Sequence, residues 1–152
     1  MTSNLVHCNV LSLANIGLLI QGASGAGKSS LTLGLLEHAQ QLGWEGYLVS
    51  DDQAFLEPHN NTLIAKTPDT IAGLLELRGH GIIEHPYQSS TKVRVVVQMI
   101  EDKLLDRMPE EKHIDFNGIR LPMIEVPIQH EAAAVRIVFA WLRKNVLSKK
   151  AS

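Results

Sequence analysis

Residues 16–29 read IGLLIQGASGAGKS, and this stretch decides the class of fold. Its first six residues are mostly apolar, which is typical of a buried strand. Its last eight, residues 22–29, satisfy the pattern G-x-x-x-x-G-K-[ST]. Residues 30–42 then repeat apolar side chains at helical spacing. The order of strand, glycine-rich loop and helix predicts a phosphate-binding loop in an α/β fold.

The residue types of this loop suit nucleotide phosphates. Glycines let backbone N–H groups turn inward, and the helix that follows presents its positive N-terminal end to an anion. We expect Lys28 to contact the β- and γ-phosphates and Ser29 to bind Mg²⁺, which keeps several waters and takes few protein ligands. A glycine-rich turn with a chance Lys-Ser pair is the alternative. The predicted nucleotide-binding residues are Gly22, Ala23, Ser24, Gly25, Ala26, Gly27, Lys28, Ser29 and Ser30.

Length and composition indicate one domain spanning residues 1–152. A chain of 152 residues, 45% hydrophobic and 20% charged, buries enough surface to need no disulfide or metal. Fourteen Lys and Arg against sixteen Asp and Glu give a net charge of −2, which is not the basic surface of a nucleic-acid binder. The single cysteine, Cys8, is predicted to be a small buried residue on an early strand. We expect a cytoplasmic chain without a membrane or nucleic-acid partner, because neither a signal peptide nor a membrane span is recognisable.

The rest of the chain adds strands, hairpins and helices to this unit. Apolar runs bounded by turn residues such as Ala14-Asn15 and Asn117-Gly118 predict strands at residues 10–13, 16–21, 46–50 and 92–99, and hairpins over residues 54–65 and 114–126. Helical spacing predicts helices at residues 30–42, 67–77 and 132–146. The sum is an α/β fold, a central mixed sheet with flanking helices and an antiparallel hairpin flank.

Two acidic residues, Asp51 and Asp52, follow the predicted strand at residues 46–50. Ligands of α/β sheets gather at the carboxyl ends of the strands. One carboxylate can hold the water shell of a metal ion while the other accepts a proton from an attacking hydroxyl. A solvated turn is the alternative. Adjacent carboxylates titrate as a coupled pair, so the sequence does not divide the two roles between them.

The segment at residues 76–83, ELRGHGII, places an acid and a base two residues apart before two glycines. Glu76 is suited to bind a cation, and Arg78 is suited to stabilise charge on a transferring phosphoryl group. Taken alone, the pattern favours a helix C-terminus with a surface ion pair between these two residues.

Four stretches together resemble the catalytic domain of the HPr kinase/phosphorylase family. They are His7, fifteen residues before Gly22, the loop at residues 22–29, LVSDD at residues 48–52 and LELRGHGII at residues 75–83. A weaker match continues over residues 117–127. Enzymes of this family phosphorylate a serine of the phosphocarrier protein HPr with ATP. The resemblance is to a short, catalytic-domain-only form and implies a P-loop-containing kinase fold.

The resemblance also implies roles for individual residues. The loop and Lys28 would hold the phosphates of ATP, and Asp52 would be the base, with His7 and Asp51 beside it. The implied catalytic residues are His7, Lys28, Asp51, Asp52 and Arg78, and the implied Mg²⁺ ligands are Ser29 and Glu76. Family members form hexamers, so the resemblance implies a homo-oligomer.

One departure from the family bears on the reaction. After Val126-Pro127 the family continues with a Pro-Gly-Arg-Asn-like stretch, whereas this chain has IQHE at residues 128–131. The missing arginine counts against phosphorolysis, and Arg94 or Arg136 would have to replace it. We therefore expect an ATP-dependent serine kinase of HPr or an HPr-like carrier. The alternatives are a P-loop kinase of a small hydroxylated metabolite and a regulatory module that binds ATP without transferring phosphate.

Overall fold

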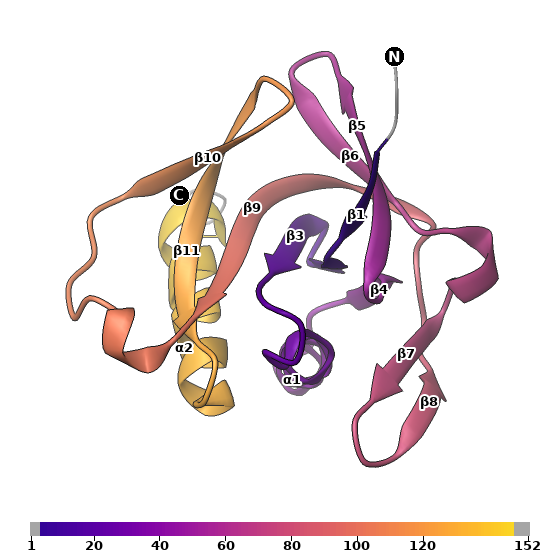
Figure 1. Ribbon diagram of the computed structural model, residues 1–152, viewed down its shortest axis with the longest axis horizontal. Helices are drawn as coiled ribbons and strands as arrows, with labels where there is room; N and C mark the ends of the chain where they lie inside the picture. Colours follow the sequence, from indigo (N-terminus) through magenta and orange to yellow (C-terminus); the bar gives the residue numbers. More distant parts are fainter. Residues whose placement is uncertain (1–3, 148–152) are drawn as a thin grey trace.

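Within residues 4–147, which this computed structural model describes, nine strands form a curled mixed sheet (Figure 1). The strands are β1 (Asn4–His7), β2 (Asn9–Leu13), β3 (Ile16–Gln21), β4 (Gly46–Ser50), β5 (Gln53–His59), β6 (Thr62–Lys66), β9 (Ser90–Ile100), β10 (Lys112–Phe116) and β11 (Ile119–Pro127). Seven of them follow the order β1-β5-β6-β9-β3-β2-β4, and β10 and β11 join at β9. The predicted strands and both predicted hairpins are confirmed.

The longest strand, β9, links the two sides of the sheet. One of its edges pairs with β3 in parallel. Its other edge pairs with β6 in antiparallel orientation over residues 90–93 and with β11 in parallel orientation over residues 96–100. On the far side of β3, strand β2 runs antiparallel between β3 and β4. Strands β3 and β4 therefore end at the same edge, which brings the glycine-rich loop close to Asp51 and Asp52.

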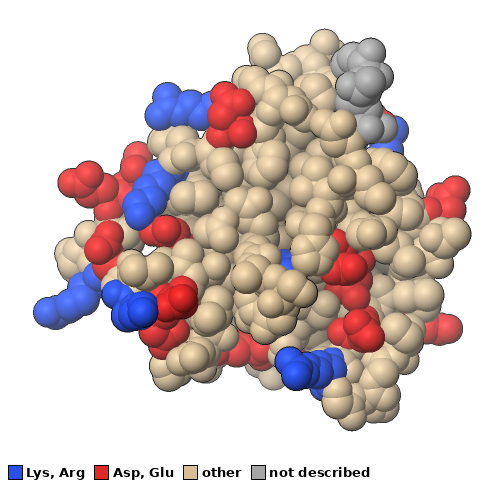
Figure 2. Space-filling model, in the orientation of Figure 1, with Lys and Arg blue, Asp and Glu red and all other residues tan. Residues whose placement is uncertain are grey.

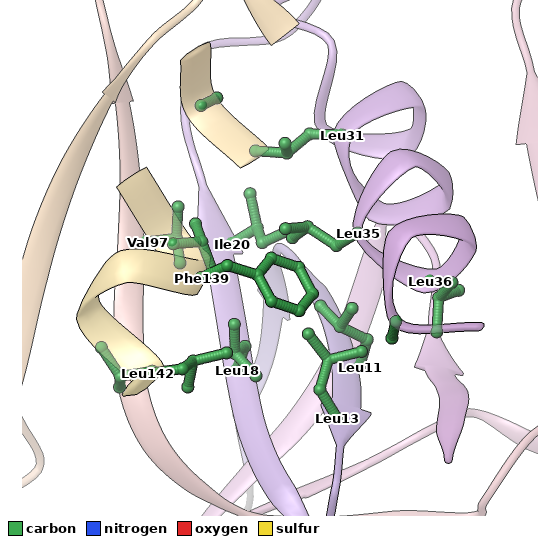
Figure 3. Close-up of a cluster of buried hydrophobic side chains, with 14 of the residues drawn as sticks. Leu11, Leu13, Leu18, Ile20, Leu31, Leu35, Leu36, Val97, Phe139 and Leu142 are labelled. Atoms are coloured by element: carbon green, nitrogen blue, oxygen red, sulfur yellow. The ribbon is translucent and has the colours of Figure 1, made fainter. Parts of the chain in front are cut away.

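Helices α1 (Lys28–Gln41) and α2 (Glu131–Leu142) pack on the same face of the sheet. Figure 3 shows the ring of Phe139 in the middle of this core, among Leu18 and Ile20 of β3 and Leu35 of α1. All four side chains are at most 1% exposed. Burying one such side chain stabilises the fold by roughly 1.5–3 kcal/mol, so the core fixes the loop between β3 and α1 from both ends.

The other face of the sheet is covered by two of the sheet's own hairpins. The curl brings the β5–β6 and β10–β11 hairpins over it (Figure 1). Side chains alternate between the two faces: Leu18 and Ile20 contact the helices, whereas Leu19 lies in the second core. Cys8 is fully buried in that second core, as predicted, but it lies between β1 and β2 rather than on a strand. Burial raises the pKa of its thiol to about 12.

The C-terminal helix is confirmed with a shorter α-helical part than predicted. Its regular turns end at Leu142, and a π-helical turn, Arg143–Leu147, follows. In the described part of the chain, no helix is both long and apolar enough to cross a membrane.

The predicted helix at residues 67–77 is wrong. A short 3₁₀ turn, Asp69–Ile71, is followed by a hairpin of β7 (Leu74–Leu77) and β8 (Gly81–Glu84). Gly73 has φ +76°, and a Cβ added to it would lie 2.8 Å from the ring of Tyr87. A helix cannot pass through this left-handed residue. The expected helix C-terminus is thus a β-turn region, and no ion pair joins Glu76 to Arg78 among the described residues.

Candidate active site

The glycine-rich loop, residues 22–27, turns sharply between β3 and α1. Gly25 and Gly27 have φ angles of +82° and +97°, which side chains rarely tolerate. Gly22 lies against β9, since a Cβ added to it would be 3.0 Å from Cβ of Met99. The glycines are therefore required by the path of the loop. No side chain caps α1 at Gly27, which leaves N–H groups of the first turn available to an anion.

Lys28 begins α1 and folds back over the loop. Its Nζ donates hydrogen bonds to the carbonyl oxygens of Gly22, at 3.1 Å, and Ala23, at 3.3 Å. The residue is only 7% exposed, so its charge is held at the loop. This is the placement that a cation needs to contact phosphates bound by the loop.

Asp51 is a buried hub, 8% exposed. Its Oδ1 accepts hydrogen bonds from Asn9 Nδ2, at 2.7 Å, and from Ser29 Oγ, at 2.5 Å. Its Oδ2 accepts a hydrogen bond from the backbone N–H of Glu76, at 2.9 Å. One carboxylate thus joins β2, α1 and β7, and these three donors fix its orientation.

Asp52 differs from Asp51 in its exposure to solvent and in the groups that it contacts. Its side chain is 63% exposed, and its Oδ1 lies 2.5 Å from Nε2 of His7. The pairing of β1 with β5 sets His7 opposite Gln53, next to Asp52. The backbone of Asp52 is left-handed, with φ +71°. The Asp52 carboxylate is thus open to the solvent beside a histidine, whereas the Asp51 carboxylate is buried among protein donors.

A cleft of about 750 Å³ brings these groups together. Its lining residues are His7, Asn9, Ser24, Gly25, Gly27, Lys28, Ser29, Ser30, Asp52, Glu76, Leu77, Arg78, Gly79, His80 and Gly81. Most of the site residues predicted from the sequence are in this set, and Asp51 lies beneath it. Gly22, Ala23 and Ala26 belong to the loop but do not line the cleft.

The donors in this cleft fit a magnesium ion. Within residues 4–147, no group of three His, Cys, Asp or Glu side chains is placed to hold a metal ion by itself. Mg²⁺ takes oxygen ligands, keeps several waters and completes its shell with substrate phosphates. The Ser29 hydroxyl and the Glu76 carboxylate are oxygen donors of this kind, next to a loop suited to phosphates.

Residues 128–131, where the resemblance leads us to expect an arginine, are held by two side-chain contacts. His130 Nε2 lies 2.6 Å from Oδ2 of Asp102, and Glu131 Oε1 accepts a hydrogen bond from Ser30 Oγ at 2.5 Å. Arg94 lines a different cavity, of about 550 Å³, between the β10–β11 hairpin and α2. Of the arginines in residues 4–147, Arg78 is the one that lines the cleft of the glycine-rich loop.

Sequence reasoning missed Asn9 and Thr32. Both side chains are fully buried, and Asn9 Nδ2 donates to Thr32 Oγ1 at 3.1 Å. In the sequence, Asn9 is only an amide residue next to an apolar strand, and this pattern by itself does not indicate a functional site.

Comparisons with known proteins show the family of this chain. The family model described as "HPr Serine kinase C-terminal domain" matches residues 1–152. The HPr kinase/phosphorylase of Lactobacillus acidophilus is 25% identical over 97% of this chain and 47% of its own length. That of Clostridium acetobutylicum is 28% identical over 95% of this chain and 50% of its own length. The chain thus spans about half the length of these curated relatives.

A solved structure of the Hpr(Ser) kinase/phosphatase from Coxiella burnetii has the same fold. It superimposes with a TM-score of 0.80 at 25% identity and covers 97% of this chain and 99% of the solved chain.

Proposed function

Since this chain belongs to the HPr serine kinase C-terminal domain family, we propose that it is an ATP-dependent kinase of a serine in HPr or an HPr-like phosphocarrier. One observation carries the proposal: an exposed carboxylate with a histidine partner shares a single cleft with a phosphate-binding loop. We also propose that residues 1–152 act as one catalytic domain, which the extent of the family match supports.

In this proposal the loop and Lys28 bind the β- and γ-phosphates of ATP. The N–H groups at the start of α1 and the ammonium group of Lys28 supply positive charge where the phosphoryl group is transferred. Arg78, in the turn of the β7–β8 hairpin, lines the same cleft, and its guanidinium is suited to the oxygens of that group.

Ser29 and Glu76 would hold Mg²⁺, which offsets the charge of the phosphates when bound. Asp51 acts through Ser29. Because the Ser29 hydroxyl donates a hydrogen bond to Asp51, the lone pairs of the Ser29 oxygen are free to bind a cation. Asp51 also fixes the backbone of Glu76, so one buried carboxylate positions both proposed ligands.

Asp52 would take the proton of the acceptor serine. As the serine oxygen forms its bond to the γ-phosphorus, the bond from that phosphorus to the β–γ bridging oxygen breaks, ADP leaves and the proton passes to the Asp52 carboxylate. Contact with His7 holds Asp52 in orientation for this transfer.

We propose that the reverse reaction, phosphorolysis, is weak. Instead of an arginine, the chain presents at residues 128–131 a histidine paired with Asp102 and a glutamate bonded to Ser30. Neither His130 nor Glu131 lines the cleft of the glycine-rich loop, so this stretch offers no guanidinium to inorganic phosphate there.

Phosphate transfer to HPr followed by intact mass tests the proposed function. We expect the carrier to gain one phosphate from Mg-ATP. The Lys28→Ala and Asp52→Ala variants should lose this activity by at least about 100-fold, the lower range for removing a charge-stabilising group or a general base. Lys92→Ala and Asp69→Ala remove exposed groups outside the cleft and serve as matched controls. ATP binding without transfer would favour the regulatory module, and transfer to a metabolite instead would favour the small-molecule kinase.

Three further properties stay predictions: a homo-oligomer, a cytoplasmic location and the lack of a nucleic-acid partner. On the face shown in Figure 2, basic and acidic side chains are interspersed rather than gathered into one basic surface, which does not favour a polyanion. Light scattering coupled to size exclusion measures the oligomeric state.

A further inference from the structure

We propose that Asn9 is a positioning residue for phosphoryl transfer, whose single side-chain amide sets Asp51 and Asp52 into their different roles. The proposal rests on the proposed function and adds a residue that the sequence motifs do not contain. Asn9 begins β2, opposite Ile20 of β3, and its neighbour Val10 is opposite Ser50 of β4. It therefore lies between the carboxyl ends of the two strands that lead into the site.

The amide group of Asn9 uses both of its donors and its acceptor. Nδ2 donates to Asp51 Oδ1 at 2.7 Å and to Thr32 Oγ1 at 3.1 Å, and Oδ1 accepts from the backbone N–H of Asp52 at 3.0 Å. The hydroxyl of Thr32 in turn donates to the carbonyl oxygen of Lys28 at 2.7 Å. One rigid planar group thus joins both aspartates to the first turn of α1.

Other residue types do not reproduce this arrangement. An ionised aspartate accepts hydrogen bonds but donates none, and it would place a like charge beside Asp51. Leucine has a similar size but neither donates nor accepts, so Asp51 and the Asp52 N–H would each lose a buried partner. Because Asn9 is fully buried, these hydrogen bonds lie out of contact with solvent.

The effect on Asp52 acts through its backbone. A left-handed φ of +71° is unfavourable for a residue with a side chain and persists only where its surroundings hold it. Asn9 holds the N–H of Asp52, and the N–H of Cys8 holds its carbonyl oxygen at 3.0 Å. Without Asn9, we expect Asp52 to relax and its carboxylate to turn away from His7 and from the cleft.

The isosteric variants Asn9→Asp and Asn9→Leu test this role, with Ser12→Ala as the matched control. Ser12 is also buried on β2, but its hydroxyl has no hydrogen-bond partner in the described part of the chain. We expect both Asn9 variants to lower kcat for carrier phosphorylation at least tenfold with the KM for ATP within about twofold, as for an interaction needed mainly in the transition state. Ser12→Ala should keep the parental values.

A second readout is independent of turnover. The ¹⁵N chemical shift of His7 Nε2 reports its contact with Asp52, and we expect Asn9→Leu to move it toward its value in an Asp52→Asn protein. If Asn9→Leu fails to fold, Asn9→Ser, with a smaller side chain, takes its place. Unchanged kcat or an unchanged His7 signal in folded variants would overturn the proposal. If the parental protein phosphorylates no carrier, the proposed function fails, whereas the His7 signal still decides whether Asn9 orients Asp52.

Discussion

A substitution in the middle of α1, Gly34→Ala, tests the contact between the two helices beside the glycine-rich loop. A Cβ added at Gly34 would lie 3.0 Å from Oε2 and 3.4 Å from Cδ of Glu131. Alanine in a helix interior is about 1 kcal/mol more favourable than glycine. Against this gain, the new methyl group requires the Glu131 carboxylate to move by a few tenths of an ångström, which weakens its hydrogen bond with Ser30.

The magnitude of the second effect follows from the nature of that bond. Hydrogen bonds to charged groups contribute about 1.5–3 kcal/mol, and the exposure of Ser30 to water reduces this to about 1 kcal/mol. The two effects nearly cancel, so we expect Gly34→Ala alone to change the free energy of unfolding by less than about 0.5 kcal/mol. In a Glu131→Ala background nothing opposes the helix propensity, and the same change should stabilise by about 1 kcal/mol.

Urea denaturation of the four proteins of this double-mutant cycle measures the coupling energy. We expect about 1 kcal/mol, well above the scatter of roughly 0.3–0.5 kcal/mol seen for independent sites. Equal m-values would show that the variants expose the same surface on unfolding. If Gly34→Ala stabilises the protein equally in both backgrounds, Glu131 does not lie against α1, and the account of how residues 128–131 are held is refuted.

Two more predictions concern stability. In Gly17→Ala, the added Cβ would lie 2.0 Å from the carbonyl oxygen of Lys92, a backbone atom of β9 that cannot move without separating β3 from β9. We expect the free energy of unfolding, measured by urea denaturation, to fall by more than about 3 kcal/mol. A denaturation midpoint equal to that of the parental protein would contradict this close approach. Because burial raises the pKa of Cys8 from 9.0 to about 12, the unfolded chain loses this proton first, and stability falls as the pH rises through that range. Between pH 7 and pH 10 the Cys8 thiol should lower the free energy of unfolding by roughly 1 kcal/mol, and Cys8→Ala should lack this decrease. An equal pH dependence of stability in both proteins would contradict the prediction.

Local chemistry explains which parts of the fold were predictable. The loop at residues 22–29 needs glycines and a lysine wherever it occurs, so its sequence is diagnostic. The turns at residues 14–15, 60–61 and 117–118 contain asparagines with positive φ, a conformation this residue tolerates. Each of these features is determined by a few adjacent residues.

The hairpin at residues 74–84 was not predictable in the same way. The spacing of Leu74, Leu75 and Leu77 is compatible with both a helix and a strand. Whether these residues form a helix or a strand depends on pairing with β8 and on the left-handed backbone of Gly73. The spacing of apolar residues contains no information on either. Here tertiary pairing overrides the local pattern.

The division of labour within the site is also a tertiary property. Asp51 and Asp52 are identical and adjacent, and the sequence assigns them no separate environments. One is buried and the other exposed because β4 ends beside β2, where the amide of Asn9 meets both of them. The motif therefore predicts two carboxylates at this edge of the sheet, and the packing of β2 determines which of them faces the cleft.

The shared strand β9 has a consequence for the order in which the protein can form. The strand that leads into the phosphate-binding loop pairs with residues 93–98, more than seventy positions later in the chain. During synthesis the loop therefore emerges long before the strand against which Gly22 rests. A ribosome-bound chain that ends before Ser90 contains every residue of the proposed ATP site, yet it lacks the strand against which the loop packs. Binding of nucleotide to nascent chains of increasing length should begin only once β9 has emerged, which makes the ligand a marker of late assembly.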